Sequence, residues 1–143
     1  MQAQLVGALT EGAPTPADFD GARLAATAEA LLSKRARAVA RAWPRLARAA
    51  GKTFATRFAD YARAHPLPCD GSPMADGRAF VAWLERAGWL TDEARVEAFA
   101  FDARYRIRKG QITPRRAPRL RVMRLRRRLI VFVHLPLIGE RWL

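Results

Sequence analysis

The sequence contains little cysteine and little histidine, the side chains on which disulfide frameworks and most transition-metal sites depend. It has one cysteine, Cys69, and two histidines, His65 and His134, in 143 residues. A single cysteine cannot form an internal disulfide. His65, Cys69 and Asp70 could contact a metal together, but they lie in one turn without a distant fourth ligand, and structural zinc sites have four ligands. We therefore expect no bound metal and no cofactor.

Long apolar segments are also missing. The longest apolar run, residues 129–138, is about half of the ~20 residues that a membrane-spanning helix needs, and it contains His134 and Pro136. The segment Met1–Leu5 lacks the basic and apolar regions of a signal peptide. The sequence therefore predicts no transmembrane segment and a cytoplasmic location.

The motifs of common enzyme classes do not occur either. No glycine-rich phosphate loop follows an expected strand, and GxSxG is absent. The acidic residues Glu93, Glu97 and Asp102 lie near basic ones such as Arg106, at the helical spacing that gives solvated ion pairs. No catalytic residue can be named, and we expect that the protein is not an enzyme.

Basic residues, in contrast, are abundant and unevenly distributed. The net charge is +13, yet residues 1–100 are nearly balanced, with 13 basic and 11 acidic side chains. Residues 104–128 contain 12 basic side chains and no acidic one. The C-terminal part therefore gives the protein its basic character, and it is the natural region in which to look for a binding surface.

Apolar residues at helical spacing predict a mainly α fold, a compact helical bundle. Pro44 suits the first turn of a helix, Gly51 a helix end, and Thr91 an N-cap that is followed by acidic residues. Asp76 is likewise interpreted as an N-cap. The expected helices are residues 20–42, 44–50, 53–64, 76–88 and 91–109.

After residue 110 the pattern changes. Residues 111–118 contain two prolines and are interpreted as a linker. Residues 119–122 alternate with a period of two and residues 129–133 are β-branched and aromatic, so both are expected to be strands of an antiparallel β-hairpin that turns at 126–128. Leu120 and Val122 are expected to face the core, leaving Arg119, Arg121 and Arg124 as peptide contacts. The domain division is residues 1–110 helical, 111–118 linker and 119–143 basic hairpin module.

Four short stretches carry a resemblance to a known family: residues 42–46, 54–58, 61–66 and 77–84, the third with the pattern Tyr-x3-His-Pro. Their order and spacing resemble the N-terminal helical domain of partner proteins that accompany multinuclear non-haem iron oxidative enzymes (MNIO) in ribosomal peptide biosynthesis. These partners are often labelled DNA-binding. The similarity covers roughly residues 5–106.

The resemblance implies a partner role. In that family the partner carries no metal, pairs with the iron enzyme as a heterodimer, and uses a C-terminal module to recognise the leader of the precursor peptide. By this likeness, Tyr61, His65 and Pro66 are expected to take part in docking the enzyme.

Three functions are compatible with these patterns. The first is an adaptor that docks an iron-dependent peptide-modifying enzyme and recruits its precursor peptide through the basic hairpin. The second is nucleic-acid binding, because a sequence pI of 11.6 and the cluster of basic residues meet the electrostatic requirement. The third is attachment to a membrane surface through the arginines and the apolar run 129–138.

Overall fold

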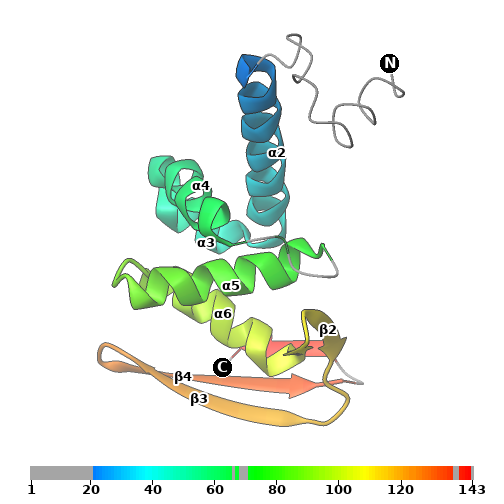
Figure 1. Ribbon diagram of the computed structural model, residues 1–143. Coiled ribbons are helices and arrows are strands. Elements are labelled where there is room, and N and C mark those ends of the chain that lie inside the picture. The colour runs from blue at the N-terminus through cyan, green and yellow to red at the C-terminus, as the bar shows by residue number, and fades with distance from the viewer. Residues whose placement is uncertain (1–20, 66, 68–70, 137–138, 143) are drawn as a thin grey trace. The chain divides into compact units, whose positions relative to one another are not determined.

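The computed structural model describes residues 21–65, 67, 71–136 and 139–142 (Figure 1). The chain forms two compact units, residues 1–34 and 35–143. The described part of the first unit is the beginning of α2, whose Leu31 is exposed. The second unit contains the remaining helices and all the described strands.

The architecture is mainly α, with helices followed by antiparallel strands, as the sequence predicted. The described strands form two antiparallel sheets, and a short 3-10 turn lies between two of the helices. The helices are α2 (Gly21–Ala42), α3 (Pro44–Ala50), η1 (Gly51–Thr53), α4 (Phe54–Ala64), α5 (Pro73–Arg86) and α6 (Asp92–Arg104).

Most helix ends lie where local chemistry predicts them. Pro44 is the first residue of α3, and Gly51 follows its end with a φ of 54°, a conformation that glycine adopts without steric cost. The hydroxyl of Thr91 accepts a hydrogen bond from the amide of Ala94, which confirms it as the N-cap of α6.

The start of α5 differs from the prediction. The helix begins at Pro73, three residues before Asp76, so Asp76 lies inside the first turn and is not its cap. Proline is well suited to the first helical position because its missing N–H would have no helical partner there. Asp76 is 1% exposed and binds a residue far away in the chain.

Aromatic rings fill the space between α4 and α5. Phe58 and Phe80 meet edge to face, with their ring centroids 5.1 Å apart, and Tyr61 lies 5.3 Å from Phe80. Trp43 is buried and donates from its indole nitrogen to the carbonyl of Met74 at 3.1 Å. The apolar stripe of α4 is therefore core, as its helical period indicated.

A buried ion pair ties the end of α2 to α5. The guanidinium of Arg35 donates to both carboxylate oxygens of Asp76 at 2.7 Å, and a further Arg35 nitrogen donates to the carbonyl of His65 at 3.0 Å. The hydroxyl of Tyr61 donates to the same carboxylate at 3.1 Å. These bonds satisfy a charge that would otherwise be costly to bury.

The expected continuation of α6 to Lys109 is wrong. The helix ends at Arg104, and β1 (Tyr105–Arg108) pairs antiparallel with β2 (Gln111–Pro114), so the segment expected to be a linker begins with a strand. Lys109 and Gly110 form the turn, and both have positive φ. Two consecutive residues with positive φ favour a tight hairpin turn. The spacing of Tyr105 and Ile107 is compatible with a strand as well as with a helix.

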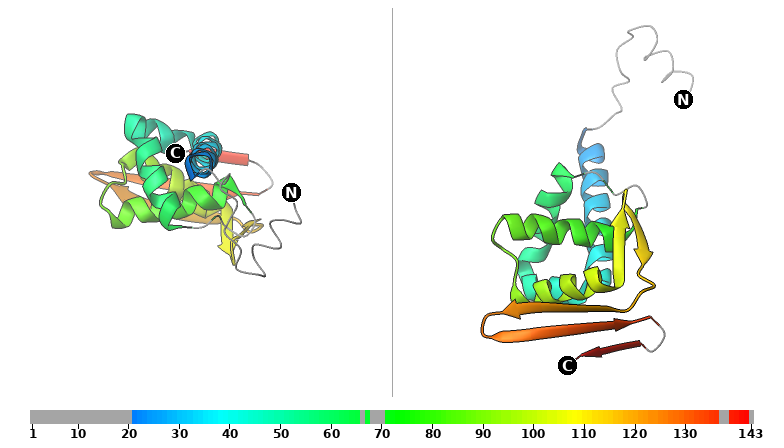
Figure 2. Two further views of the ribbon diagram at one scale, coloured as in Figure 1. Left: turned by 45° about the horizontal axis from the view of Figure 1, so that its top comes forward. Right: turned by 90° about the horizontal axis from the view of Figure 1, so that it is seen from below.

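The last three strands form one antiparallel sheet in the order β3-β4-β5: β3 (Arg119–Leu125), β4 (Arg128–Leu135) and β5 (Gly139–Trp142). β3 and β4 are joined by a two-residue turn, one residue shorter than expected. Figure 2 shows the strands side by side, and α6 packs against β3 and β4. Phe132 of β4 is fully buried in a cluster with Phe99, Ala100 and Ala103 of α6.

Candidate functional site

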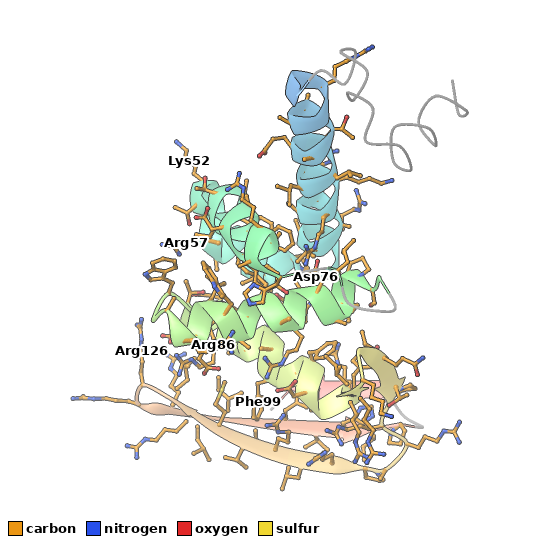
Figure 3. All side chains as sticks on the ribbon, in the orientation of Figure 1. Lys52, Arg57, Asp76, Arg86, Phe99 and Arg126 are labelled. Carbon is orange, nitrogen blue, oxygen red and sulfur yellow. The ribbon has the colours of Figure 1, made fainter. Side chains whose placement is uncertain are left out.

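The tip of the basic hairpin β3-β4 contacts the start of α6 through one exposed ion pair. Arg126 lies in the turn with a φ of 54°, and its Nε is 2.7 Å from a carboxylate oxygen of Asp92, in the first turn of α6 (Figure 3). Leu125 and Arg128 flank the two-residue turn as a pair. This pair sets the register of every other pair in the hairpin.

The face of β3 that packs against α6 carries an arginine. Arg121 pairs across the hairpin with Phe132, and residues directly opposite in an antiparallel pair point to the same face. Its guanidinium lies 4.8 Å from the centroid of the Phe99 ring and 3.8 Å from a carboxylate oxygen of Asp102. A cation over an aromatic face beside a carboxylate is favourably placed. Arg121 therefore has partners within the protein.

The prediction that Leu120 and Val122 face the core is wrong. Leu120 is 66% exposed and Val122 is 52% exposed, and both lie on the face of the sheet opposite α6. They stand beside Val133 and Val131 of β4, and Leu129, which pairs with Arg124, is 66% exposed. The outer face of the hairpin is thus an apolar surface with a basic residue on it. We call these side chains the outer face; they are Leu120, Val122, Arg124, Leu129, Val131 and Val133.

β3 lies at an edge of its sheet, because β4 is its one neighbour in the strand order. The backbone groups of an antiparallel strand point alternately to the two sides, and the residues that close a two-residue turn bond to each other. Leu125 and Arg128 close the turn, so Leu125 and every second residue before it bond to β4. The amide and carbonyl groups of the residues between them, Leu120, Val122 and Arg124, point away from β4. We call these groups the β3 edge. Within the described residues no other strand pairs with it.

Arginines surround a hollow at the start of β3. Its volume is about 380 Å³. Four of its lining residues are Arg106, Arg115, Arg116 and Arg119, and among the described lining residues none is acidic or aromatic. We call this hollow the arginine pocket.

One arginine of this pocket is held in place by the backbone. The Nε of Arg115 donates to the carbonyls of Asp102 and Tyr105, each at 3.1 Å. Burial, followed by the positive charges of Arg119, Arg106 and Arg121, lowers the pKa of Arg115 from its ordinary value. The charge of Asp102 acts on Arg115 in the opposite direction, but more weakly than each of these arginines.

The expected docking residues lie at the end of α4. Tyr61 is buried, and its ring stacks on that of His65 with centroids 4.7 Å apart. His65 is half-buried, and its Nδ1 lies 2.7 Å from the carbonyl oxygen of Tyr61. Burial raises the pKa of Tyr61, with a further contribution from the charge of Asp76. Pro66 lies outside the described residues. Docking through this group stays a prediction.

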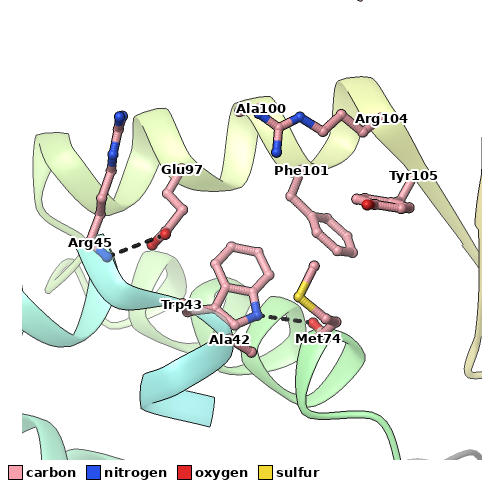
Figure 4. A pocket seen from close by; sticks show the side chains of 9 residues that line it. All are labelled: Ala42, Trp43, Arg45, Met74, Glu97, Ala100, Phe101, Arg104 and Tyr105. Carbon is pink, nitrogen blue, oxygen red and sulfur yellow. Dashed lines mark hydrogen bonds between the residues drawn. The ribbon is translucent and has the colours of Figure 1, made fainter. Parts of the chain in front are cut away.

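A second hollow of about 330 Å³ lies between α3, α5 and α6 (Figure 4). Trp43, Met74 and Phe101 line it together with Glu97. The Glu97 carboxylate is already engaged, since it accepts hydrogen bonds from the amides of Arg45 at 3.2 Å and Leu46 at 2.7 Å. A carboxylate at the N-terminus of α3 satisfies amides that have no helical partner, so its role is structural.

The described side chains that could ligate a metal are scattered over the fold. In the ranges that the structure describes, no group of three histidine, cysteine, aspartate or glutamate side chains is arranged to hold a metal ion. Cys69 and Asp70, which are near His65 in the sequence, lie outside those ranges. No helix among the described residues is both long and apolar enough to cross a membrane.

The fold and this surface define a helical domain that carries a basic antiparallel sheet with a free edge. Residues 1–86 match the family described as "SCO6045-like, C-terminal domain". The chain therefore belongs to the SCO6045-like, C-terminal domain family.

A longer relative shows the same region inside a larger protein. The chain is 34% identical over 136 residues to a "UPF0276 protein" of Streptomyces avermitilis. The match covers 91% of this chain but 26% of the relative. The chain thus spans about a quarter of that relative's length. No solved structure matches the chain.

The sequence interpretation missed the arginine pocket. It selected Arg119, Arg121 and Arg124 from the alternation of β3, whereas the pocket joins Arg119 to Arg106, Arg115 and Arg116. These residues belong to the same basic segment 104–128, so the charge run was the available signal. The hairpin β1-β2, which brings Arg106 back toward the start of β3, was not visible from local periodicity.

Proposed function

We propose that this domain is a non-catalytic adaptor that docks an iron-dependent peptide-modifying enzyme and helps to recruit its precursor peptide. The observation that carries the proposal is the β3 edge. An extended peptide can add as a further strand there, with main-chain hydrogen bonds supplying affinity and side-chain surfaces supplying selectivity.

The side chains around the β3 edge fit such a ligand. Leu120 and Val122 are exposed beside the edge, so alternate apolar residues of an added strand would pack next to them. Arg124 on the same face and Arg119 at the strand start are exposed and available to acidic side chains. Arg121 is proposed to act differently, by holding β3 against α6.

The enzyme-docking part of the proposal draws support from the comparisons. The chain matches a family described as a C-terminal domain, and three quarters of the UPF0276 relative lies outside the shared region. In the relative, the region like this chain is joined to a larger region within one polypeptide. We propose that this chain binds a protein that resembles that larger region. The resemblance of residues 42–84 to MNIO partners supplies the proposed class of that partner.

Backbone pairing at the β3 edge can be tested with Val122→Pro. Proline removes the outward N–H of residue 122, and edge strands tolerate it because no bond to β4 is lost. The matched control is Val122→Thr, which keeps the N–H and the β-branched shape. With a strand-forming peptide of alternating valine and serine, we expect about tenfold weaker binding for proline and little change for threonine. Equal binding by both variants would contradict strand addition.

Enzyme docking needs a separate measurement. Affinity capture with the intact chain from an extract of its native cells, followed by metal analysis of the captured protein, tests it directly. We expect a partner that contains more than one iron ion per chain and copurifies in a one-to-one ratio. Capture of nucleic acid in place of such a protein would contradict the adaptor function.

Nucleic-acid binding is the second candidate, and the basic cluster favours it. Residues that track phosphates act mainly through charge, so binding should fall steeply with salt. Strand addition depends on geometry and should depend less on salt. Titrating the alternating peptide and a DNA duplex at two salt concentrations therefore distinguishes the two functions.

A further inference from the structure

Positive charge is concentrated around the arginine pocket. Across the described residues, no carboxylate forms an ion pair with Arg106, Arg116 or Arg119. The positive charges of Arg106 and Arg119 act unfavourably on that of Arg115, and a bound anion would offset this repulsion. The hollow is therefore electrostatically suited to an anionic ligand.

The pocket adjoins the β3 edge. Arg119 belongs to both, since it lines the pocket and is the first residue of β3. In Figure 2 the β1-β2 hairpin lies at the end of the sheet where β3 begins. A peptide strand that pairs along β3 would thus pass the pocket at one end.

The lining favours a carboxylate of a peptide over a single-stranded nucleic acid. Single-stranded nucleic acids bind where bases can stack on aromatic side chains, and no residue that the structure describes in the pocket lining is aromatic. Arginine forks match the two oxygens of a carboxylate in a bidentate geometry. The hydrogen bonds from Arg115 to two main-chain carbonyls orient its guanidinium group before any ligand binds.

We propose that the arginine pocket binds the carboxylate of an aspartate or glutamate side chain in the peptide strand that pairs with β3. This proposal rests on the proposed function, because the strand brings the carboxylate to the pocket. It assigns a substrate class: an extended peptide with alternate apolar residues and an acidic residue at the end that passes the start of β3.

The first arm of the test uses citrate, a small polycarboxylate that needs no strand pairing. The side-chain Nε–H signals of the arginines are followed by NMR while citrate is added to the intact chain. We expect saturable shifts at Arg106, Arg115, Arg116 and Arg119 that exceed those at Arg127 and Arg128. Equal shifts at all arginines would show that the pocket is not an anion site. This result would not depend on whether a peptide strand adds to β3.

The second arm compares two alternating valine-serine peptides that differ only in carrying glutamate or glutamine at their ends. We expect about tenfold tighter binding of the glutamate peptide. In the double variant Arg106→Gln and Arg116→Gln this preference should fall to about twofold, with the glutamine peptide unaffected. The matched control, Arg127→Gln with Arg128→Gln, removes the same charge at the other end of the hairpin.

The outcomes separate the two proposals. A control that loses the preference equally would show a general charge effect and overturn the pocket. Failure of both peptides to bind, with citrate still saturating the pocket, would refute strand addition and with it the peptide as the source of the carboxylate. A DNA duplex that loses affinity in the pocket variant, while the peptide preference is unchanged, would assign the site to phosphates.

Discussion

Asp76→Asn should destabilise the protein strongly, because it removes the charge from a nearly enclosed ion pair. The Asp76 side chain is 1% exposed and that of Arg35 is 11% exposed. Asparagine has the same shape, but its amide group would face the Arg35 nitrogens with a donor in place of an acceptor. The Arg35 charge would then remain buried, with one neutral amide oxygen and main-chain carbonyls as its acceptors.

Breaking a buried pair by removing one partner costs about 3–5 kcal/mol. At roughly 4 °C per kcal/mol for a protein of this size, the midpoint of thermal unfolding should fall by roughly 10–20 °C. The extra bond from Tyr61 to the same carboxylate places the effect toward the upper end of this range.

The assay is chemical and thermal unfolding followed by circular dichroism, with Asp60→Asn as the matched control. Asp60 forms an ion pair with Arg63 at 3.3 Å, but both side chains are more than half exposed, so this substitution should cost at most about 0.5 kcal/mol. A cycle that adds Arg35→Gln should show strong coupling with Asp76→Asn. Similar midpoints for the two asparagine variants would refute the reasoning, since they would show that enclosure does not matter.

Three further predictions concern other contacts of the helical part. Gly77→Ala should destabilise the fold severely, because a Cβ at this position would collide with the indole ring of Trp43; a midpoint like that of the native protein would show that the ring can move aside. Glu97→Ala should cost about 1–2 kcal/mol in denaturant unfolding, since it leaves two amides of α3 without their acceptor, whereas Glu97→Gln should keep part of the effect. The raised pKa of Tyr61 predicts that stability is fully present below its ordinary value of 10.0 and is lost as the pH rises above it, because the unfolded state ionises first. Tyr61→Phe should flatten this alkaline loss in unfolding curves measured from pH 8 to 11, and an unchanged slope would show that the ionisation of Tyr61 does not cause the loss.

Local chemistry was sufficient for much of the fold. Pro44, Gly51 and Thr91 act through backbone rules that need no distant partner, so the corresponding helix boundaries were predictable. The strands near residues 119–122 and 129–133 were also predictable, from alternation and β-branched composition. Where local preferences were balanced, as at Tyr105 and Ile107, the helix and strand patterns could not be told apart.

The candidate site was only partly predictable. The run of basic residues indicated the correct region, and the strand alternation correctly divided β3 into two faces. Alternation alone does not say which face is covered, because that depends on what packs against the sheet. The interpretation assumed that apolar residues face inward, and this assumption assigned Leu120 and Val122 to the wrong side.

The sequence by itself determined several helix boundaries, the strands near residues 119–122 and 129–133, and the segment in which positive charge accumulates. The tertiary structure alone decided which side chains are available. In the folded protein Arg121 contacts the Phe99 ring and the Asp102 carboxylate of α6. An arginine can therefore face α6 while Leu120 and Val122 lie on the opposite, exposed face. The tertiary structure also placed Asp76 beside Arg35, 41 residues earlier in the chain. These outcomes depend on contacts between distant segments, and residue spacing along one segment carries no information about them.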